Sequence, residues 1–257
     1  MRIRSSLVAA TIGFAFSLMQ GVAAEAAEVK VMAGIAMRAV WEELAPQFER
    51  ATGHKLLIWY GFTGAIRERM EAGETFDVAV FGKGSLDEYT KQGKIAADTH
   101  TAIARVGMGM AARAGAPKPD ISSVEAFKRV LLDAKSVTYQ TNGAPGIHMT
   151  SVFRRLGITE QMKAKYRRLE GKQQSTLPRV ASGEAEFGFT FTNEILVARG
   201  VELVGPLPLE LQRYSLFTAG IGTAARGPAA ARALIAFLRS PPAVEVIKAK
   251  GMEPATP

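Results

Sequence analysis

The segment VKVMAGIAMRAVWEELAPQFERATG, residues 29–53, passes directly from a strand-like run into a helical pattern. The sequence VKV at its start has the alternation of a β-strand. Apolar residues then recur at Val40, Leu44 and Phe48, the spacing of one helix face, and Gly53 stands where a helix C-terminal cap belongs. A strand that runs straight into a helix is the unit from which α/β folds are built.

The same order of elements follows twice more along the chain. Residues 56–60 (LLIWY) are predicted to form a second, buried strand, and a helix carrying Ile66 follows it. Residues 76–80 alternate apolar and small or polar side chains as a third strand, and Ser85 is predicted to be the N-cap of the next helix. Three successive βα units predict one α/β lobe.

Two extended runs, residues 102–112 and 214–221, separate this lobe from a second group of elements. That group includes predicted helices at 123–134 and 176–182 and a strand at 187–191. Two more helices are expected after the second run. The chain therefore crosses between two lobes twice, and the first lobe is discontinuous in sequence.

We accordingly expect an α/β fold of two lobes, with mixed, mostly parallel sheets flanked by helices and a hinge of two strands. Lobe 1 is predicted to consist of residues 25–106 and 217–257, and lobe 2 of residues 107–216.

The first 24 residues have the layout of a secretory signal peptide. Arg2 and Arg4 precede an apolar stretch, and small residues follow it up to Ala24. The stretch is too short and too interrupted for a transmembrane anchor, which needs about 20 apolar residues. Cleavage after Ala24 or after Ala26 satisfies the small-residue rule. The sequence contains no cysteine to carry a lipid or a disulfide, so a soluble periplasmic protein is expected.

Composition argues against several other functions. The formal charge is +8, but basic and acidic residues are interleaved, so a nucleic-acid partner is not expected. The three histidines, His54, His100 and His148, lie far apart in sequence, and no nucleophile with a base, metal-ligand spacing or calcium loop is visible. We therefore predict no catalytic residues, no metal and no cofactor, and a protein that is not an enzyme.

Several short motifs, in their order and spacing, resemble the molybdate-binding family of periplasmic proteins of ABC transporters. They are AGIAM at 33–37, GFTGAI at 61–66, EAG at 71–73 with FDVAVF at 76–81, APGI at 144–147, and FLRSP at 237–241. The resemblance covers nearly the whole predicted mature chain. It implies two hinged lobes that close on one small anion, held by strand-to-helix turns whose backbone N–H groups are free to bind it.

The resemblance also implies the residues of the site. Counted by position they are, in lobe 1, Ala36, Thr63 and Gly64 and, in lobe 2, Pro145, Gly146, Gln173 and Phe191. Members of the family commonly have serine at the position of Ala36 and tyrosine at that of Phe191. Two hydroxyl donors are thus absent here, and each lost hydrogen bond to a charged group is worth about 1.5–3 kcal/mol.

The expected function is that of a monomeric solute-binding protein that delivers a small anionic ligand, a molybdate-like oxyanion or a small organic acid, to an ABC permease in the inner membrane. Two alternatives remain open at this point. The protein could instead be the ligand-sensing partner of a membrane receptor, or an enzyme that acts on a small anion.

Overall fold

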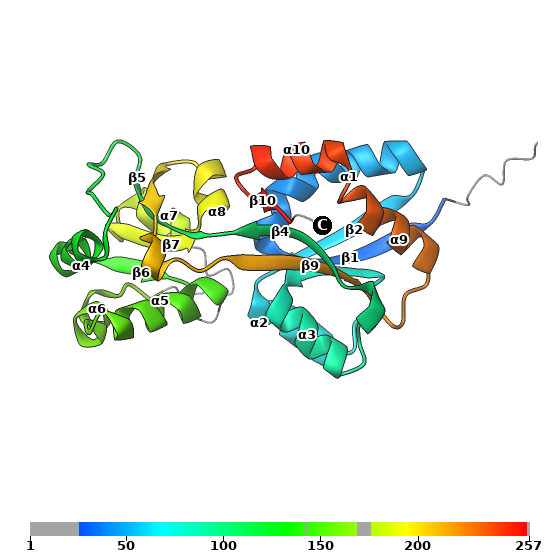
Figure 1. Cartoon of the computed structure of the whole chain (residues 1–257), viewed down its shortest axis with the longest axis horizontal. Helices are drawn as coiled ribbons and strands as arrows, with labels where there is room; N and C mark the ends of the chain where they lie inside the picture. Colours follow the sequence, from blue (N-terminus) through cyan, green and yellow to red (C-terminus); the bar gives the residue numbers. More distant parts are fainter. Residues whose placement is uncertain (1–25, 142, 169–175, 256–257) are drawn as a thin grey trace, which may run out of the picture.

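The computed structural model describes residues 26–141, 143–168 and 176–255 and has two α/β lobes (Figure 1). The strand order is β10-β4-β9-β3-β1-β2 in a six-stranded sheet and β6-β7-β5-β8 in a four-stranded sheet. The first sheet comprises β1 (Glu28–Gly34), β2 (Lys55–Gly61), β3 (Val78–Gly82), β4 (Thr101–Val106), β9 (Ser215–Ile221) and β10 (Glu253–Pro254). The second comprises β5 (Met108–Arg113), β6 (Val137–Tyr139), β7 (Phe187–Phe191) and β8 (Val201–Pro206).

Helices cover both faces of each sheet. In the first lobe, α1, α9 and α10 lie on one face and α2 and α3 on the other (Figure 1). Their bounds are α1 (Arg38–Thr52), α2 (Thr63–Glu71), α3 (Lys83–Lys91), α9 (Pro228–Phe237) and α10 (Pro241–Ala249). The second lobe contains α4 (Val124–Asp133), α5 (Ala144–Arg155), α6 (Thr159–Lys165), α7 (Thr176–Ser182) and α8 (Thr192–Val197). Three short 3-10 helices are η1 (Ile35–Met37), η2 (Ala97–Thr99) and η3 (Leu209–Leu211).

The opening unit, β1 followed by η1 and α1, forms as predicted. Val31 faces α1 while the neighbouring Met32 faces α2, because successive strand side chains point to opposite faces of the sheet. Trp41 and Phe48 of α1 are fully buried. Gly53 ends the helix with φ of 75°, a left-handed conformation that glycine adopts without a steric penalty.

The two-lobe α/β architecture is confirmed, but the expectation of mostly parallel sheets is wrong. Among the described residues, β1 pairs in parallel with β2 and β3, and β6 pairs in parallel with β7. The other five strand pairs are antiparallel. The crossing strands β4, β5 and β9 cause the difference, because a chain that leaves one lobe and later returns must run in both directions.

Other sequence predictions were wrong in detail. Strand β2 lies at the edge of its sheet and Leu57 is half exposed, so the strand is not buried. Helix α3 begins at Lys83 with Gly82 as its N-cap, so Ser85 lies inside the helix. The short elements α6, α8, β8 and β10 were not predicted at all, because their apolar patterns are too brief to show a period.

Two chain crossings join the lobes side by side (Figure 1). Gly107 lies between β4 and β5, and the returning chain enters β9 at Ser215. The Gln212 amide ties the crossings together: its Oε1 accepts from Met108 N at 2.8 Å and its Nε2 donates to Met108 O at 2.9 Å. A Cβ at position 107 would lie 3.1 Å from this amide, which favours glycine there.

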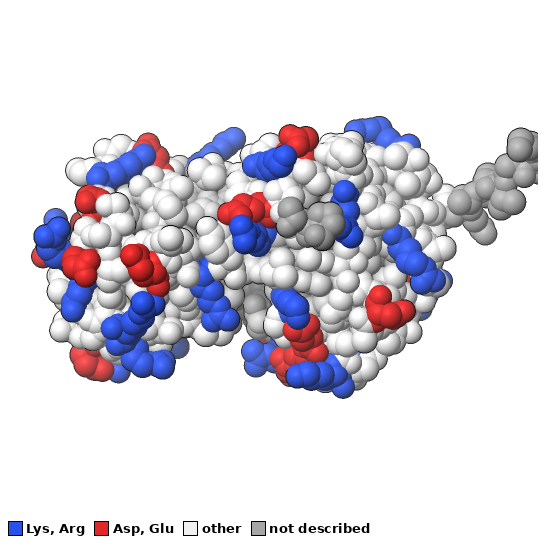
Figure 2. Space-filling model, viewed as in Figure 1, with Lys and Arg blue, Asp and Glu red and all other residues white. Residues whose placement is uncertain are grey.

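The described residues include no helix that is both long and apolar enough to cross a bilayer. The visible face carries acidic and basic side chains interspersed over both lobes, in agreement with their interleaving in the sequence (Figure 2). The surface is notched where the lobes meet (Figure 2).

The buried carboxylate of Asp77 joins three segments of the first lobe. Its Oδ2 accepts from Lys30 N of β1 at 2.8 Å, and its Oδ1 accepts from Arg226 N at 2.7 Å and Gly227 N at 3.3 Å, just before α9. Asp77 is only 4% exposed, so its carboxylate is largely removed from water and depends on these three backbone donors for its hydrogen bonds.

Replacing Asp77 by Ala should therefore lower the free energy of unfolding by about 2–4 kcal/mol, because three backbone donors lose a charged acceptor. Urea denaturation at pH 7 measures the change. Asp133→Ala, at an exposed position at the end of α4, is the matched control and should change stability by less than about 0.5 kcal/mol. Equal effects of the two substitutions would contradict this account of Asp77.

Candidate functional site

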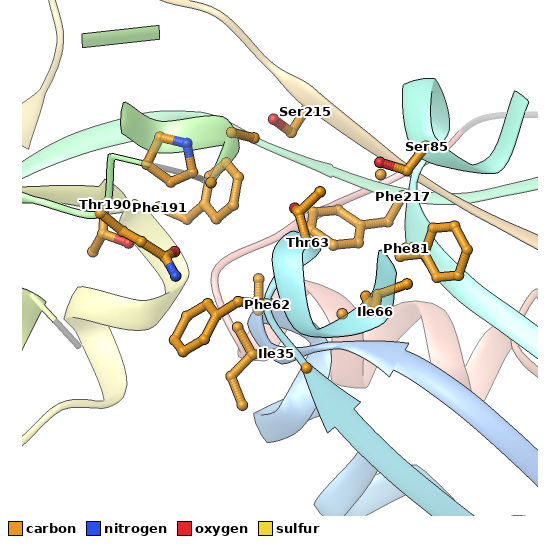
Figure 3. Close-up of a pocket in the computed structure, with 18 of the residues that line it drawn as sticks. Ile35, Phe62, Thr63, Ile66, Phe81, Ser85, Thr190, Phe191, Ser215 and Phe217 are labelled. Atoms are coloured by element: carbon orange, nitrogen blue, oxygen red, sulfur yellow. The ribbon is translucent and has the colours of Figure 1, made fainter. Parts of the chain in front are cut away.

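An inner pocket lies between the two lobes, with an empty volume of about 620 Å³ that includes the part open to solvent. Figure 3 shows Thr63, Phe81 and Phe217 on one side and Thr190 and Phe191 on the other. The lining residues are Gly34, Ile35, Ala36, Gly61, Phe62, Thr63, Ile66, Phe81, Gly82, Ser85, Gln140, Gly143, Ala144, Pro145, Thr190, Phe191, Glu194, Ser215 and Phe217.

Three helices of at least nine residues, α2, α3 and α5, begin at this pocket. Their N-cap residues are Phe62, Gly82 and Gly143, and no N-cap side chain caps any of the three. First-turn N–H groups have no partner within their own helix, and the helix dipole adds a partial positive charge at the same end. The pocket is therefore electrostatically suited to an anion, although none of its described lining residues is a lysine, arginine or histidine.

Four of the residues implied by the resemblance, Ala36, Thr63, Pro145 and Phe191, line the inner pocket. Gly64 and Gly146 belong to the first turns of α2 and α5 but are not among the described lining residues. Gln173 lies outside the described residues.

Gly146 has a packing reason to be glycine. A Cβ at this position would lie 1.9 Å from the carbonyl oxygen of Gln140, closer than any side chain can approach. The start of α5 can therefore pack against the chain after β6, which brings the side chain of Gln140 to the pocket.

Sequence reasoning missed most of the remaining polar lining, namely Ser85, Gln140, Thr190, Glu194 and Ser215. It also missed the apolar wall that Ile35, Phe62, Ile66, Phe81 and Phe217 form. For Ile35, Phe62 and Phe81 the available signal was position, because they follow the predicted strands near residue 31, at 56–60 and at 76–80, and ligands bind beyond the carboxyl ends of strands in α/β sheets. The type of a single residue at such a position did not show whether its side chain lines a pocket or packs in the hydrophobic core.

Glu194, in α8, is the one acidic residue among the described lining of the inner pocket. Burial raises the pKa of its carboxyl, and hydrogen bonds from the Thr190 hydroxyl and the Phe191 backbone N–H act in the opposite direction. The side chain retains partial exposure, which is toward the cavity that it lines. Burial therefore favours the neutral form of this carboxyl more than it would be favoured in an exposed glutamate.

The lobes also touch each other directly beside the pocket. Asn193 Nδ2 of α8 donates to Ala36 O at 2.8 Å, and both residues are buried. The rings of Phe191 and Phe217 pack edge to face, with centroids 6.0 Å apart. These contacts link β7 and α8 of one lobe to η1 and β9 of the other, so the inner pocket is bounded by both.

His148 lies outside the inner pocket. Its Nε2 is 2.8 Å from Leu211 O in the same lobe, and burial lowers the pKa of its ring. Within the described residues there is no cluster of three or more His, Asp or Glu side chains that could hold a metal ion.

A pocket bounded by two α/β lobes and lined by helix starts is the arrangement expected of a solute-binding protein. The profile of the family described as bacterial extracellular solute-binding protein matches residues 29–253, and the chain belongs to this family. The family assignment made from the sequence motifs is thereby confirmed.

Two curated relatives carry different names. Aconitate isomerase of a Pseudomonas species is 34% identical over 218 residues, which cover 82% of each chain. The molybdate-binding protein ModA of Azotobacter vinelandii is 29% identical over 239 residues, covering 89% of this chain and 91% of the relative. The solved structure of the Azotobacter vinelandii periplasmic molybdate-binding protein superposes with a TM-score of 0.72 at 22% identity, covering 89% of this chain and 99% of that one, and shows the shared fold.

The raised pKa of Glu194 makes the protein's stability depend on pH in a definite direction. Between the unfolded pKa, about 4.3, and the higher folded pKa, the folded chain binds more protons than the unfolded one. The free energy of unfolding from this group therefore falls as pH rises through that window. Glu194→Gln removes the effect, so the variant should gain stability relative to the wild type between pH 4.5 and pH 8. Urea denaturation at both pH values tests this, and a relative loss at pH 8 would contradict it.

Proposed function

We propose that the protein binds a small organic carboxylate in the inner pocket and delivers it to an ABC permease. The observation that carries this proposal is the combination of three uncapped helix starts with an apolar wall around one cavity. Helix N-termini bind the carboxylate end of such a ligand, and apolar side chains contact its carbon skeleton.

The same combination argues against a bare oxyanion. Molybdate offers only oxygen atoms, each of which prefers a hydrogen-bond donor, whereas Phe62, Phe81, Phe191 and Phe217 present hydrocarbon to the cavity. Ala36 and Phe191 also supply no side-chain donor. An anion with a carbon skeleton of a few atoms therefore fits this lining better than molybdate or sulfate.

We propose that residues 25–106 with 217–257 move as one lobe and residues 107–216 as the other. A ligand that contacts Thr63 of the first lobe and the Ala144–Pro145 turn of the second binds the closed form better, and this difference drives closure. The paired crossings, held by Gln212, are the hinge of this motion.

Membership in a family of extracellular solute-binding proteins supports export of this protein from the cytoplasm. The signal peptide predicted at residues 1–24 would direct that export. We propose a periplasmic monomer whose closed form docks on an inner-membrane permease. A membrane sensor that recognises the closed form would use the same site and the same closure.

A thermal-shift screen tests the ligand class. At 100 times its dissociation constant, a ligand should stabilise the protein by about 2.7 kcal/mol, or roughly 5–11 °C for a chain of this size. We expect such shifts from di- and tricarboxylates such as succinate and trans-aconitate, and none from molybdate or sulfate. Thr63→Ala should weaken carboxylate binding by about 1–3 kcal/mol. Thr159→Ala, likewise at the first position of a helix, is the control and should not weaken it. A shift from molybdate alone would overturn the proposal.

A second candidate function is isomerisation of an unsaturated polycarboxylate. Two observations favour it: the relative named aconitate isomerase, and the carboxyl of Glu194 in the inner pocket. Moving a carbon–carbon double bond by a 1,3-proton shift requires a group that removes a proton from one carbon and returns one to another. A carboxylate can remove the first proton and the resulting carboxylic acid can return one, and the burial that raises the pKa of Glu194 makes it a stronger base than an exposed carboxylate. The reaction leaves the composition of the substrate unchanged.

If the protein is an isomerase, it should convert trans-aconitate to cis-aconitate, as followed by chromatography of the two acids. Glu194→Gln should then lower the rate by about 100- to 10,000-fold, the usual contribution of a general acid–base group. Glu125→Gln, at an exposed position in α4, should leave the rate unchanged. Binding of trans-aconitate without any conversion by the wild type would exclude this candidate and leave the transport function.

A further inference from the structure

Glu194 lies at the junction of two cavities. The inner pocket adjoins an outer hollow, which we define by its lining residues Ile35, Ala36, Arg38, Ala39, Glu42, Phe62, Gln140, Thr176, Leu177, Thr190, Asn193, Glu194 and Val197. Glu194, Gln140 and Thr190 line both cavities. A ligand in the inner pocket would therefore lie against this group of three polar side chains.

The carboxyl is held in place from its own lobe. Thr190 Oγ1 donates to Glu194 Oε2, and the Phe191 backbone N–H also donates to the carboxyl. Phe191 is the N-cap of α8 and Glu194 is its third residue, which is the glutamate position of a capping box, but the N-cap side chain makes no cap hydrogen bond in return. These bonds fix the position of the side chain, while the part exposed to the cavities remains available to a ligand.

No described lysine or arginine forms an ion pair with Glu194. Across the outer hollow it faces Arg38 and Glu42 of α1, whose charges are of opposite sign. The elements that pack around α8 contain further charged side chains, and three of them form ion pairs with other residues. Glu202 pairs with Lys118, Arg179 with Glu184, and Lys250 with Glu43. Arg113 lies at the opposite end of β5 from the residue that pairs with Phe191.

An ionised Glu194 would repel the anion that the three helix starts attract, because both charges would share one partly buried cavity. A neutral carboxylic acid has the opposite effect, since its O–H donates a hydrogen bond to a carboxylate oxygen. The helix starts favour an anionic ligand, and the Glu194 side chain favours the same ligand only when its carboxyl is neutral.

We propose that Glu194 binds the ligand as a neutral carboxylic acid, donating its proton in a hydrogen bond to a carboxylate of the bound organic anion, so that ligand binding takes up a proton. This inference rests on the proposed function and identifies the side chain that links its affinity to pH. The raised pKa of the carboxyl before ligand binding is consistent with it, and a bound anion would raise that pKa further.

Isothermal titration with trans-aconitate between pH 7.5 and pH 9.5 tests the proposal. Like charges raise the last pKa of a tricarboxylate above that of an isolated carboxyl, and this range keeps the ligand fully ionised, so it contributes little to the pH dependence. Wild-type affinity should fall as pH rises above the pKa of Glu194 in the free protein, approaching about tenfold per pH unit. Titrations in phosphate and in Tris, which differ in ionisation enthalpy, should show uptake of up to one proton per ligand.

Glu194→Gln keeps a neutral hydrogen-bond donor and should bind trans-aconitate with an affinity that is nearly constant across the range, without proton uptake. Glu125→Gln, in α4, is the matched control and should retain the wild-type profile. Infrared difference spectra of the wild-type complex should contain a protonated carboxyl band that the Glu194→Gln complex lacks. This band reports protonation directly, even if the variant binds weakly.

The possible failures are distinguishable. Wild-type binding that is independent of pH, or an unchanged pH profile in Glu194→Gln, would overturn this inference and leave the proposed function in place. A wild-type protein that gives no binding heat with trans-aconitate, succinate or citrate would overturn both.

Discussion

The function proposed for this protein depends on backbone N–H groups that their own helices cannot satisfy. Each of α2, α3 and α5 follows a glycine or phenylalanine N-cap without a capping side chain, and all three begin at one cavity between the lobes. Unpaired N–H groups in a partly buried place are costly unless an acceptor arrives. A bound anion is such an acceptor, which explains how a cavity without lysine or arginine in its described lining can attract negative charge.

Sequence patterns were sufficient to predict most of the strands and helices that place these helix starts at one cavity. The passage from VKV into a helical period, and its repetition at residues 56–81, predicted the βα units, and the two extended runs predicted a chain that leaves the first lobe and returns. The direction of the crossing strands was not visible in composition or period, so the sheets contain more antiparallel pairs than expected. Short elements such as α8 were not predicted because their apolar patterns are too brief to show a period. Glu194, which lies in α8, was therefore not recognised as a site residue either.

The site shows why residue type alone was a poor guide. Thr63 was named through the resemblance of the motif GFTGAI to the molybdate-binding family, whereas Gln140 and Ser215 reach the cavity only through the packing of distant segments. Catalytic residues are recognised in a sequence chiefly as a nucleophile with its base or as histidine ligands at metal-binding spacing. A single carboxyl whose pKa is set by burial and by a hydrogen bond from Thr190 leaves no such trace in the sequence. Binding and isomerisation would use the same cavity. They differ in the role of Glu194, which donates a hydrogen bond to the ligand in binding and transfers protons in isomerisation.

The central claim is that helix starts from both lobes bind the carboxylate of a small organic anion in the inner pocket. A crystal structure of the protein grown with the carboxylate that stabilises it most is the most direct test. The account predicts carboxylate oxygens about 2.7–3.2 Å from backbone nitrogens in the first turns of α2 and α5, with the carbon skeleton against Phe62 and Phe191. A ligand held outside this pocket by lysine or arginine side chains would contradict it.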